Sequence, residues 1–360
     1  MNRPPPKAGN SEESEEPINQ TRYPSPPQHV TNASRGIHAP SFSSFQPREL
    51  RFTSAHPSPH VAWSCDGRRL ASVGIDKAVR IWSPEKSLDP RSATQYVGGH
   101  DFDVDYVAWN PTHPELFCTS SQRDKKIVFW DARQSRCVQT YVHSIAPSRL
   151  NYSPDGKTIV FTAVTPQFGF LTLNQGKGET KPSWSYSKHE NRSLSATCAI
   201  FNNIGDGLVM CHSRQNSITV VDYPSLNVRE NFSAHVWGTQ DIAIDPRGRY
   251  LVSGGGDSLV DIFDMNDWIC VNTITACEHP INALSFSHDG EYLAIASQGP
   301  YINICAVETG LPLHRVPTHG PVPTVTWHPS KYILAYCGEK PSITPNTTST
   351  AYISLFGPGM

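Results

Sequence analysis

The 360-residue sequence predicts an all-β fold, a seven-bladed β-propeller that occupies residues 48–357. Three observations predict it. A unit of about 45 residues repeats seven times, each unit keeps one seven-residue register, and most units hold four β-type runs. Units that each form a four-stranded sheet close into a propeller, because every sheet then buries its faces against two neighbours.

Every unit contains an anchor, an aromatic or aliphatic residue that ends a short β-type run. The anchors are Trp63, Trp109, Tyr152, Phe201, Ile244, Phe286 and Trp327, and their successive spacings are 46, 43, 49, 43, 42 and 41 residues. An aliphatic residue follows each anchor by seven positions, at Leu70, Leu116, Ile159, Leu208, Leu251, Leu293 and Leu334. Turns such as Asp66-Gly67 lie between the two and favour a tight hairpin. This period and hairpin are typical of WD40 repeats.

The other strands follow in a fixed order within each unit. Third strands are predicted at residues 79–82, 127–130, 218–221, 260–263 and 302–305, and more polar fourth strands at residues 137–141 and 270–274. The last unit ends after its third strand, at residues 352–356. We expect a strand from Glu49 to Thr53 to complete that blade, which closes the ring and removes two free sheet edges.

Residues 1–47 differ in composition from the rest of the chain. They are rich in Pro, Ser, Asn and Gln and carry an acidic cluster around Glu12 and Glu16. Such a segment buries too little apolar surface to offset the entropy lost on ordering, so we predict a disordered tail.

Charge and cysteine content narrow the classes of function. Lys and Arg number 30 against 32 Asp and Glu, without the basic excess of a free-standing nucleic-acid binder, so we do not expect strong direct RNA binding. The nine cysteines show no C-x-x-C spacing, which favours a reduced compartment, the cytosol or nucleus. No signal peptide or membrane-spanning apolar stretch is apparent. We expect no metal and no cofactor.

Three units carry a histidine, a serine, an aspartate and an aromatic residue at related positions. The sets are His56, Ser72, Asp76 and Trp82; His100, Ser120, Asp124 and Trp130; and His235, Ser253, Asp257 and Phe263. Ser, His and Asp also form catalytic triads, but a triad needs an exposed nucleophile and occurs once. Recurrence favours a structural network in which Asp accepts from His, and His bridges to the Ser and the Trp. We therefore predict no enzymatic activity. A hydrolase remains the alternative function if Ser72 or Ser120 is exposed.

One short motif indicates an alternative function. Trp130-Asp131-Ala132-Arg133 matches the W-D-x-R pattern of propellers that serve as substrate receptors of cullin-4 ubiquitin ligases, where the arginine engages an adaptor. The same four residues are also an ordinary end for a third strand. Arg133 is therefore a candidate partner contact.

The chain resembles subunit 3 of the THO complex, the WD40 component of the transcription–export (TREX) machinery. The likeness covers about residues 48–357 and is strongest over residues 242–250, continuing through the Asp-Ser-Leu-Val run at 257–260 to residues 270–271. The Tyr-Pro-Ser-Leu run at 223–226 supports it. The resemblance implies a non-catalytic nuclear scaffold subunit that docks onto large helical THO subunits. It also implies indirect work with a DEAD-box RNA helicase and an mRNA export adaptor, in support of mRNP assembly and mRNA export.

Overall fold

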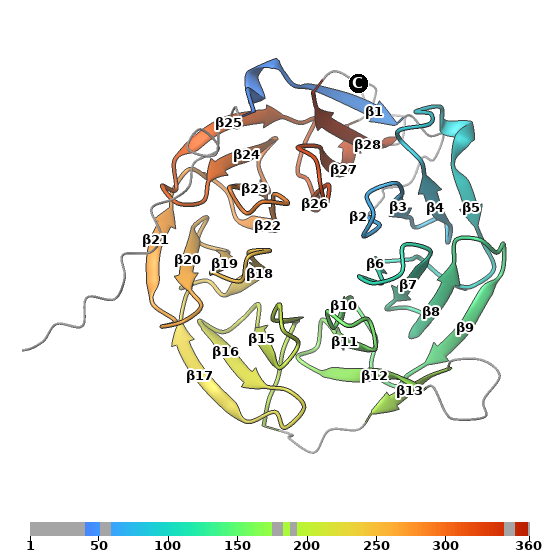
Figure 1. Ribbon diagram of the computed structural model, residues 1–360, viewed down its shortest axis with the longest axis horizontal. Helices are drawn as coiled ribbons and strands as arrows, with labels where there is room; N and C mark the ends of the chain where they lie inside the picture. The colour runs from blue at the N-terminus through green and yellow to red at the C-terminus, as the bar shows by residue number, and fades with distance from the viewer. Residues whose placement is uncertain (1–39, 51–58, 175–182, 188–192, 342–349, 359–360) are drawn as a thin grey trace, which may run out of the picture. The chain divides into compact units, whose positions relative to one another are not determined.

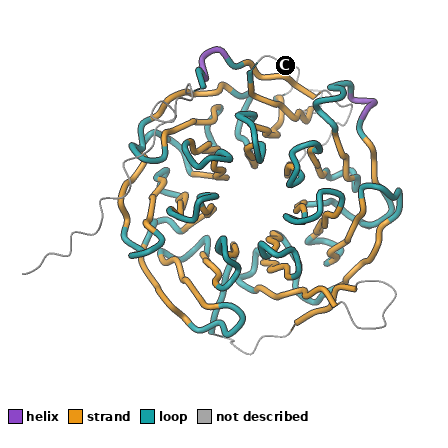
Figure 2. Tube along the Cα trace, viewed as in Figure 1, coloured by secondary structure: helices purple, strands orange, loops and turns teal. Residues whose placement is uncertain are grey.

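The computed structural model describes residues 40–50, 59–174, 183–187, 193–341 and 350–358. Within these ranges the strands form seven four-stranded antiparallel sheets, or blades, arranged around a ring in the unit that begins at Pro40 (Figure 1). Strands make up nearly all of the regular structure, and two short helical turns lie at the outer edge (Figure 2). The predicted seven-bladed propeller is confirmed.

For each of the first four blades, the strands are given in order from the innermost to the outermost. Blade 1 is β2 His60–Trp63, β3 Leu70–Val73, β4 Val79–Trp82 and β5 Thr94–Tyr96. Blade 2 is β6 Tyr106–Trp109, β7 Leu116–Ser121, β8 Lys126–Asp131 and β9 Cys137–Val142. Blade 3 is β10 Arg149–Tyr152, β11 Thr158–Thr162, β12 Phe168–Asn174 and β13 Ser183–Ser187. Blade 4 is β14 Cys198–Phe201, β15 Gly207–Cys211, β16 Ser217–Asp222 and β17 Val228–Ser233.

The last three blades follow the same order. Blade 5 is β18 Thr239–Ile244, β19 Tyr250–Gly255, β20 Val260–Asp264 and β21 Cys270–Ile274. Blade 6 is β22 Ile281–Phe286, β23 Tyr292–Ser297, β24 Tyr301–Ala306 and β25 Pro312–Pro317. Blade 7 is β26 Thr324–Trp327, β27 Leu334–Lys340, β28 Thr350–Gly357 and β1 Gln46–Leu50. The two helical turns are η2 Phe42–Ser44 and η3 Pro90–Ser92.

The seven-residue register comes from the hairpin between the two inner strands. The anchor lies directly opposite the residue seven positions later, as in Trp63 opposite Leu70 and Trp327 opposite Leu334. Gly67 adopts a φ of 71° in the first of these turns, a conformation that costs glycine little. Blade 2 differs, because its hairpin is one residue longer and places Phe117 opposite Trp109, where Leu116 was expected.

An N-terminal strand closes the ring, but not over the residues predicted for it. Strand β1 pairs with β28 from Gln46 opposite Gly357 to Leu50 opposite Ile353. The prediction of Glu49 to Thr53 was therefore right about the partner and wrong about the start, and residues 51–53 lie outside the described residues. Leu50 is fully buried between blades 7 and 1, which fixes the register because a slip of one residue would turn it to solvent.

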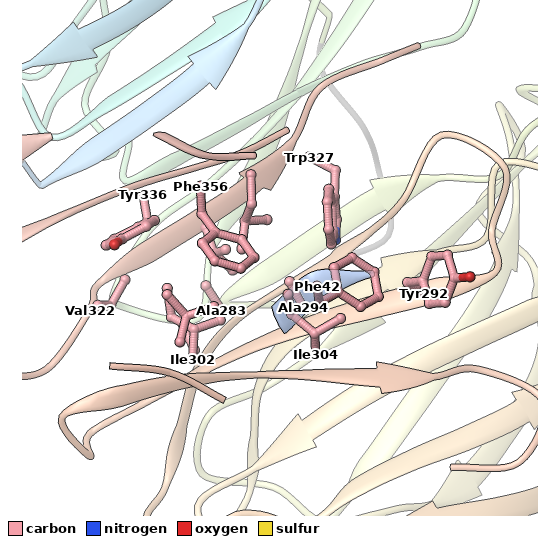
Figure 3. Close-up of a cluster of buried hydrophobic side chains, with 14 of the residues drawn as sticks. Phe42, Ala283, Tyr292, Ala294, Ile302, Ile304, Val322, Trp327, Tyr336 and Phe356 are labelled. Carbon is pink, nitrogen blue, oxygen red and sulfur yellow. The ribbon is translucent and has the colours of Figure 1, made fainter. Parts of the chain in front are cut away.

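The ordered propeller begins earlier than residue 48. Phe42 and Phe45 lie in the segment predicted to be a tail, yet they are only 5% and 8% exposed. Figure 3 shows Phe42 between Tyr292 of blade 6 and Trp327 of blade 7, with ring centroids 4.9 and 6.2 Å away. Two aromatic side chains bury enough surface to order residues 40–47 despite their polar neighbours. Residues 1–39 lie outside the described residues.

The core consists of layers between neighbouring blades. The layer in Figure 3 joins Ile302 and Ile304 of blade 6 to Trp327 and Tyr336 of blade 7. The predicted third strands are buried, whereas β9 and β21 alternate or expose their side chains at the rim, as expected for fourth strands. In the part of the chain with assigned structure, no helix has the length and apolar character to cross a membrane.

Candidate interaction sites

The polar network of blade 5 brings together three of the predicted residues. His235 precedes β18, and its Nδ1 lies 3.0 Å from Asp257 Oδ1, while its Nε2 lies 2.9 Å from Ser253 Oγ on β19. Asp257, in the turn after β19, also accepts the backbone N–H groups of Val236 and Leu259. The histidine is buried and both of its ring nitrogens are satisfied, so the network ties the loop that follows blade 4 to the hairpin of blade 5.

Blade 2 uses a different hydroxyl from the one predicted. His100 Nδ1 lies 3.0 Å from Asp124 Oδ2, and its Nε2 lies 2.8 Å from Thr119 Oγ1. Trp130 Nε1 donates to the same Thr119 oxygen at 2.8 Å. Ser120 Oγ reaches only the Ser148 carbonyl, at 3.5 Å, so the assignment of Ser120 to this network was wrong.

The error comes from the length of one turn. The network hydroxyl always lies opposite the residue two positions before the aromatic side chain. The pairs are Ser72 opposite Arg80, Thr119 opposite Val128 and Ser253 opposite Asp261. The turn from β7 to β8 has one residue more than that of blade 1, so counting four residues back from Asp124 reaches Ser120, which faces the other side of the sheet.

Only part of the blade 1 set can be followed, because His56 lies outside the described residues. Trp82 Nε1 donates to Ser72 Oγ at 2.9 Å. Asp76 accepts hydrogen bonds from the backbone N–H of Ala78 and from both terminal nitrogens of Arg80. Burial opposes the ionisation of Asp76, but the hydrogen bonds and charge of Arg80 outweigh it and lower the pKa of the carboxyl. Asp76 therefore has a cationic partner, Arg80, that the sequence pattern did not predict.

In these networks, the polar side chains form hydrogen bonds with one another inside the protein. Burial lowers the pKa of His100 despite the neighbouring Asp124, so the imidazole is neutral at neutral pH. Ser72, Thr119, Ser120 and Ser253 are all buried. A nucleophile must meet a substrate, and none of these hydroxyls reaches solvent.

Thr119→Val tests which hydroxyl is the centre of the blade 2 network. Valine keeps the volume but leaves His100 Nε2 and Trp130 Nε1 without a partner, so we expect the free energy of unfolding to fall by about 2–3 kcal/mol. Ser120→Ala is the matched control and should cost less than about 1 kcal/mol. Urea unfolding followed by tryptophan fluorescence compares the two, and equal losses would contradict the role assigned to Thr119.

The innermost strands of the seven described blades enclose a central cavity of about 850 Å³. Arg149 of β10 and Asp241 of β18 both line this cavity and form an ion pair, and Arg149 also donates to the Gln240 carbonyl at 3.1 Å. Asp241 in turn accepts the Leu284 N–H at 2.8 Å. The ion pair thus links blades 3, 5 and 6. Sequence reasoning missed it, because 92 residues separate the partners and no local pattern marks either one.

His60 and Tyr106 lie in the wall of the same cavity and stack with ring centroids 3.8 Å apart. Burial, together with the positive charge of Arg149, lowers the pKa of His60 to about 3. Its Nδ1 is buried and has no protein hydrogen-bond partner among the described residues. A neutral imidazole is therefore the only form that this position accommodates at neutral pH.

We expect stability to fall as the pH drops below about 6.5. The folded pKa of His60 lies below its unfolded value, so the unfolded state takes up the proton first and acid favours unfolding. Urea unfolding at pH 7.5, 6.5 and 5.5 measures the slope. His60→Phe keeps the stacking on Tyr106 without a titrating group, and its slope should be smaller by up to one proton. Parallel slopes for the two proteins would contradict this account.

Arg133 follows β8 and its side chain is 68% exposed. The guanidinium is not free, since Nε donates to Asp131 Oδ1 at 2.9 Å and Nη2 donates to Asp131 Oδ2 at 2.7 Å. This bidentate pair fixes the guanidinium relative to Asp131. Among the described residues there is no group of three or more His, Cys, Asp or Glu side chains placed to hold a metal ion.

Fold and repeats together define a WD40-repeat propeller. The family model for the WD domain, G-beta repeat, matches residues 48–83, 92–131, 227–264 and 268–304. The chain is 32% identical over 297 residues to THO complex subunit 3 of Arabidopsis thaliana, a match that covers 82% of this chain and 91% of that protein. The chain belongs to the THO complex subunit 3 family.

More distant relatives and one solved structure also match most of this chain. WD repeat-containing protein AAC3 of Dictyostelium discoideum is 27% identical over 83% of this chain and 64% of its own length. Eukaryotic translation initiation factor 3 subunit I of Caenorhabditis elegans is 24% identical over 78% of this chain and 89% of its own. The crystal structure of the Myceliophteria thermophila Cps50 (Swd1) β-propeller domain superposes with a TM-score of 0.70 at 15% identity, covering 88% of this chain and all of that one, and supports the fold alone.

Proposed function

We propose that this protein is a non-catalytic scaffold subunit of the nuclear THO/TREX complex, where it supports co-transcriptional mRNP assembly and mRNA export. The observation that carries the proposal is the 32% identity to THO complex subunit 3, which extends over 91% of that protein. A match over 297 residues is long enough to include loops and outer strands, where partners would bind, as well as the core.

The physical character of the ring supports a scaffold. The described histidine networks are buried and satisfied, and they hold loops and blades in a single arrangement. The fourth strands offer exposed rims to partners, with apolar side chains at Val138, Val228, Val271 and Leu313. The net charge of −2 provides little general attraction for RNA. Protein partners are therefore favoured, namely the large helical THO subunits, with the DEAD-box helicase and the export adaptor bound indirectly.

Purification of the tagged full-length chain from nuclear extract tests the proposal. We expect THO subunits in stoichiometric amounts by mass spectrometry, with retention that survives nuclease treatment because the contacts are between proteins. An unrelated WD40 propeller with the same tag is the control. Absence of THO subunits from the tagged chain, or their loss after nuclease, would refute the proposed scaffold role.

The exposure of Arg133 favours a second candidate, a substrate receptor of a cullin-4 ubiquitin ligase. This second function requires Arg133 to bind an adaptor, although its guanidinium already forms a bidentate pair with Asp131. Arg133→Ala separates the two candidates in the same purification. A scaffold of THO keeps its partners in this variant, whereas a ligase receptor co-purifies with the cullin adaptor and loses it.

A further inference from the structure

Two cysteines of blade 4 face each other across neighbouring strands. Cys198 begins β14, Cys211 ends β15, and the two are register partners. Directly opposed residues of an antiparallel pair have Cα atoms roughly 4.5–5.5 Å apart, which lies within the roughly 4.4–6.8 Å that a disulfide spans. Both side chains belong to the same buried cluster, and their thiols are within hydrogen-bonding range. The strands thus place two free thiols opposite each other, at a backbone separation that a disulfide can span.

The surroundings of Cys198 favour its thiolate. Arg149 Nη1 lies 3.4 Å from Cys198 Sγ. The hydrogen bond from Cys211 lowers the pKa of Cys198, and the charge of Arg149 adds to this effect against burial and against the negative Asp241. At Cys118 and Cys305, by contrast, burial is the largest effect, and it raises the pKa of each thiol to about 12. A cysteine beside a guanidinium is the kind that reacts.

The central cavity gives small reagents a route to this sulfur. Cys198 lines the cavity, but only 4% of its surface is exposed, and Cys211 lies behind it. A molecule the size of hydrogen peroxide can approach such an atom, whereas a peptide thiol such as glutathione is too bulky. The site therefore selects its oxidant by size.

We propose that Cys198 and Cys211 are a peroxide-reactive dithiol in the wall of the central cavity, which hydrogen peroxide converts into an intramolecular disulfide. The Cys198 thiolate attacks one peroxide oxygen, so that an S–O bond forms, the O–O bond breaks and the leaving hydroxide takes up a proton to become water. Cys211 then attacks the sulfenic sulfur; the S–S bond forms, the S–O bond breaks and a second water leaves. Two thiols lose two electrons, and one peroxide is reduced to two waters. The inference does not depend on the proposed role in THO.

Peroxide titration of the purified full-length protein tests the proposal. After brief exposure to hydrogen peroxide, the protein is denatured, its remaining thiols are alkylated, and non-reduced peptides are analysed by mass spectrometry. We expect a Cys198–Cys211 linked peptide that disappears with dithiothreitol. Cys337, equally buried and without a cysteine partner in register, is the internal control and should be modified at least 10-fold more slowly.

Three variants separate the parts of the mechanism. Cys211→Ser should stop at a sulfenic acid on Cys198, which a dimedone probe labels. Arg149→Met combined with Asp241→Asn removes both charges together, which keeps the cavity neutral, and should slow the oxidation of Cys198 about 10-fold. Cys337→Ser should leave the rate unchanged. Circular dichroism confirms that each variant is folded.

Two results would overturn the proposal. If the folded protein is exposed to peroxide that oxidises the exposed Cys137, and Cys198 and Cys211 both remain alkylatable after denaturation, the pair is inert. The proposal also fails if the double charge variant, still folded, forms the disulfide at the original rate.

Discussion

Asp124→Ala is expected to lower the free energy of unfolding by about 3 kcal/mol. The carboxylate accepts three hydrogen bonds, from His100 Nδ1 at 3.0 Å and from the backbone N–H groups of Asp101 and Lys126 at 3.1 and 2.9 Å. Its side chain is only 3% exposed, so water cannot replace the lost acceptor without a rearrangement of the loop. The loss should appear mainly as faster unfolding if the blade 2 network forms late in folding.

Two further variants make the test specific. Asp124→Asn retains one side-chain acceptor and should recover part of the lost stability. Asp76→Ala removes the corresponding aspartate of blade 1, which is 22% exposed and paired with Arg80, and should cost only about 1 kcal/mol. Urea unfolding monitored by circular dichroism gives the three values. An Asp124→Ala protein as stable as the parent would show that the network contributes nothing.

Removal of the closing strand should have the largest effect. A chain that begins at residue 51 lacks β1, η2 and the buried side chains of Phe42, Phe45 and Leu50. Each of these burials is worth about 1.5–3 kcal/mol, and the five register pairs with β28 are lost as well. The sum approaches the whole stability of an ordinary domain, about 5–15 kcal/mol, and leaves the β28 edge open to aggregation.

Two other truncations locate the boundary of the ring. A chain that begins at Pro40 retains every described contact of η2 and β1, and we expect it to unfold like the parent. A chain that begins at Arg48 keeps Leu50 but loses the Phe42 and Phe45 contacts with blades 6 and 7, and should be intermediate. Thermal unfolding and size-exclusion chromatography rank the three. A monomeric, cooperatively folded chain starting at residue 51 would contradict the closing role of β1.

The sequence by itself determined the number of blades, the order of their strands and the presence of a closing strand. These features depend on local signals, namely the period of the anchors, the Asp-Gly turns and the alternation of side chains, which act within one unit. The same signals identified His235, Ser253 and Asp257, because the blade 5 turn has the standard length.

Other contacts between side chains were decided by the tertiary structure alone. The β7–β8 turn has one extra residue, so the network hydroxyl is that of Thr119, where Ser120 was predicted. Side chains in a strand alternate between the two faces, and a shift of one residue therefore reverses the face. The pairing of Arg149 with Asp241 required the ring to bring side chains of blades 3 and 5 within reach of each other. The ordering of Phe42 depended on a pocket that blades 6 and 7 build together from residues far away in the chain. Contacts between blades depend on ring geometry, which no single repeat encodes.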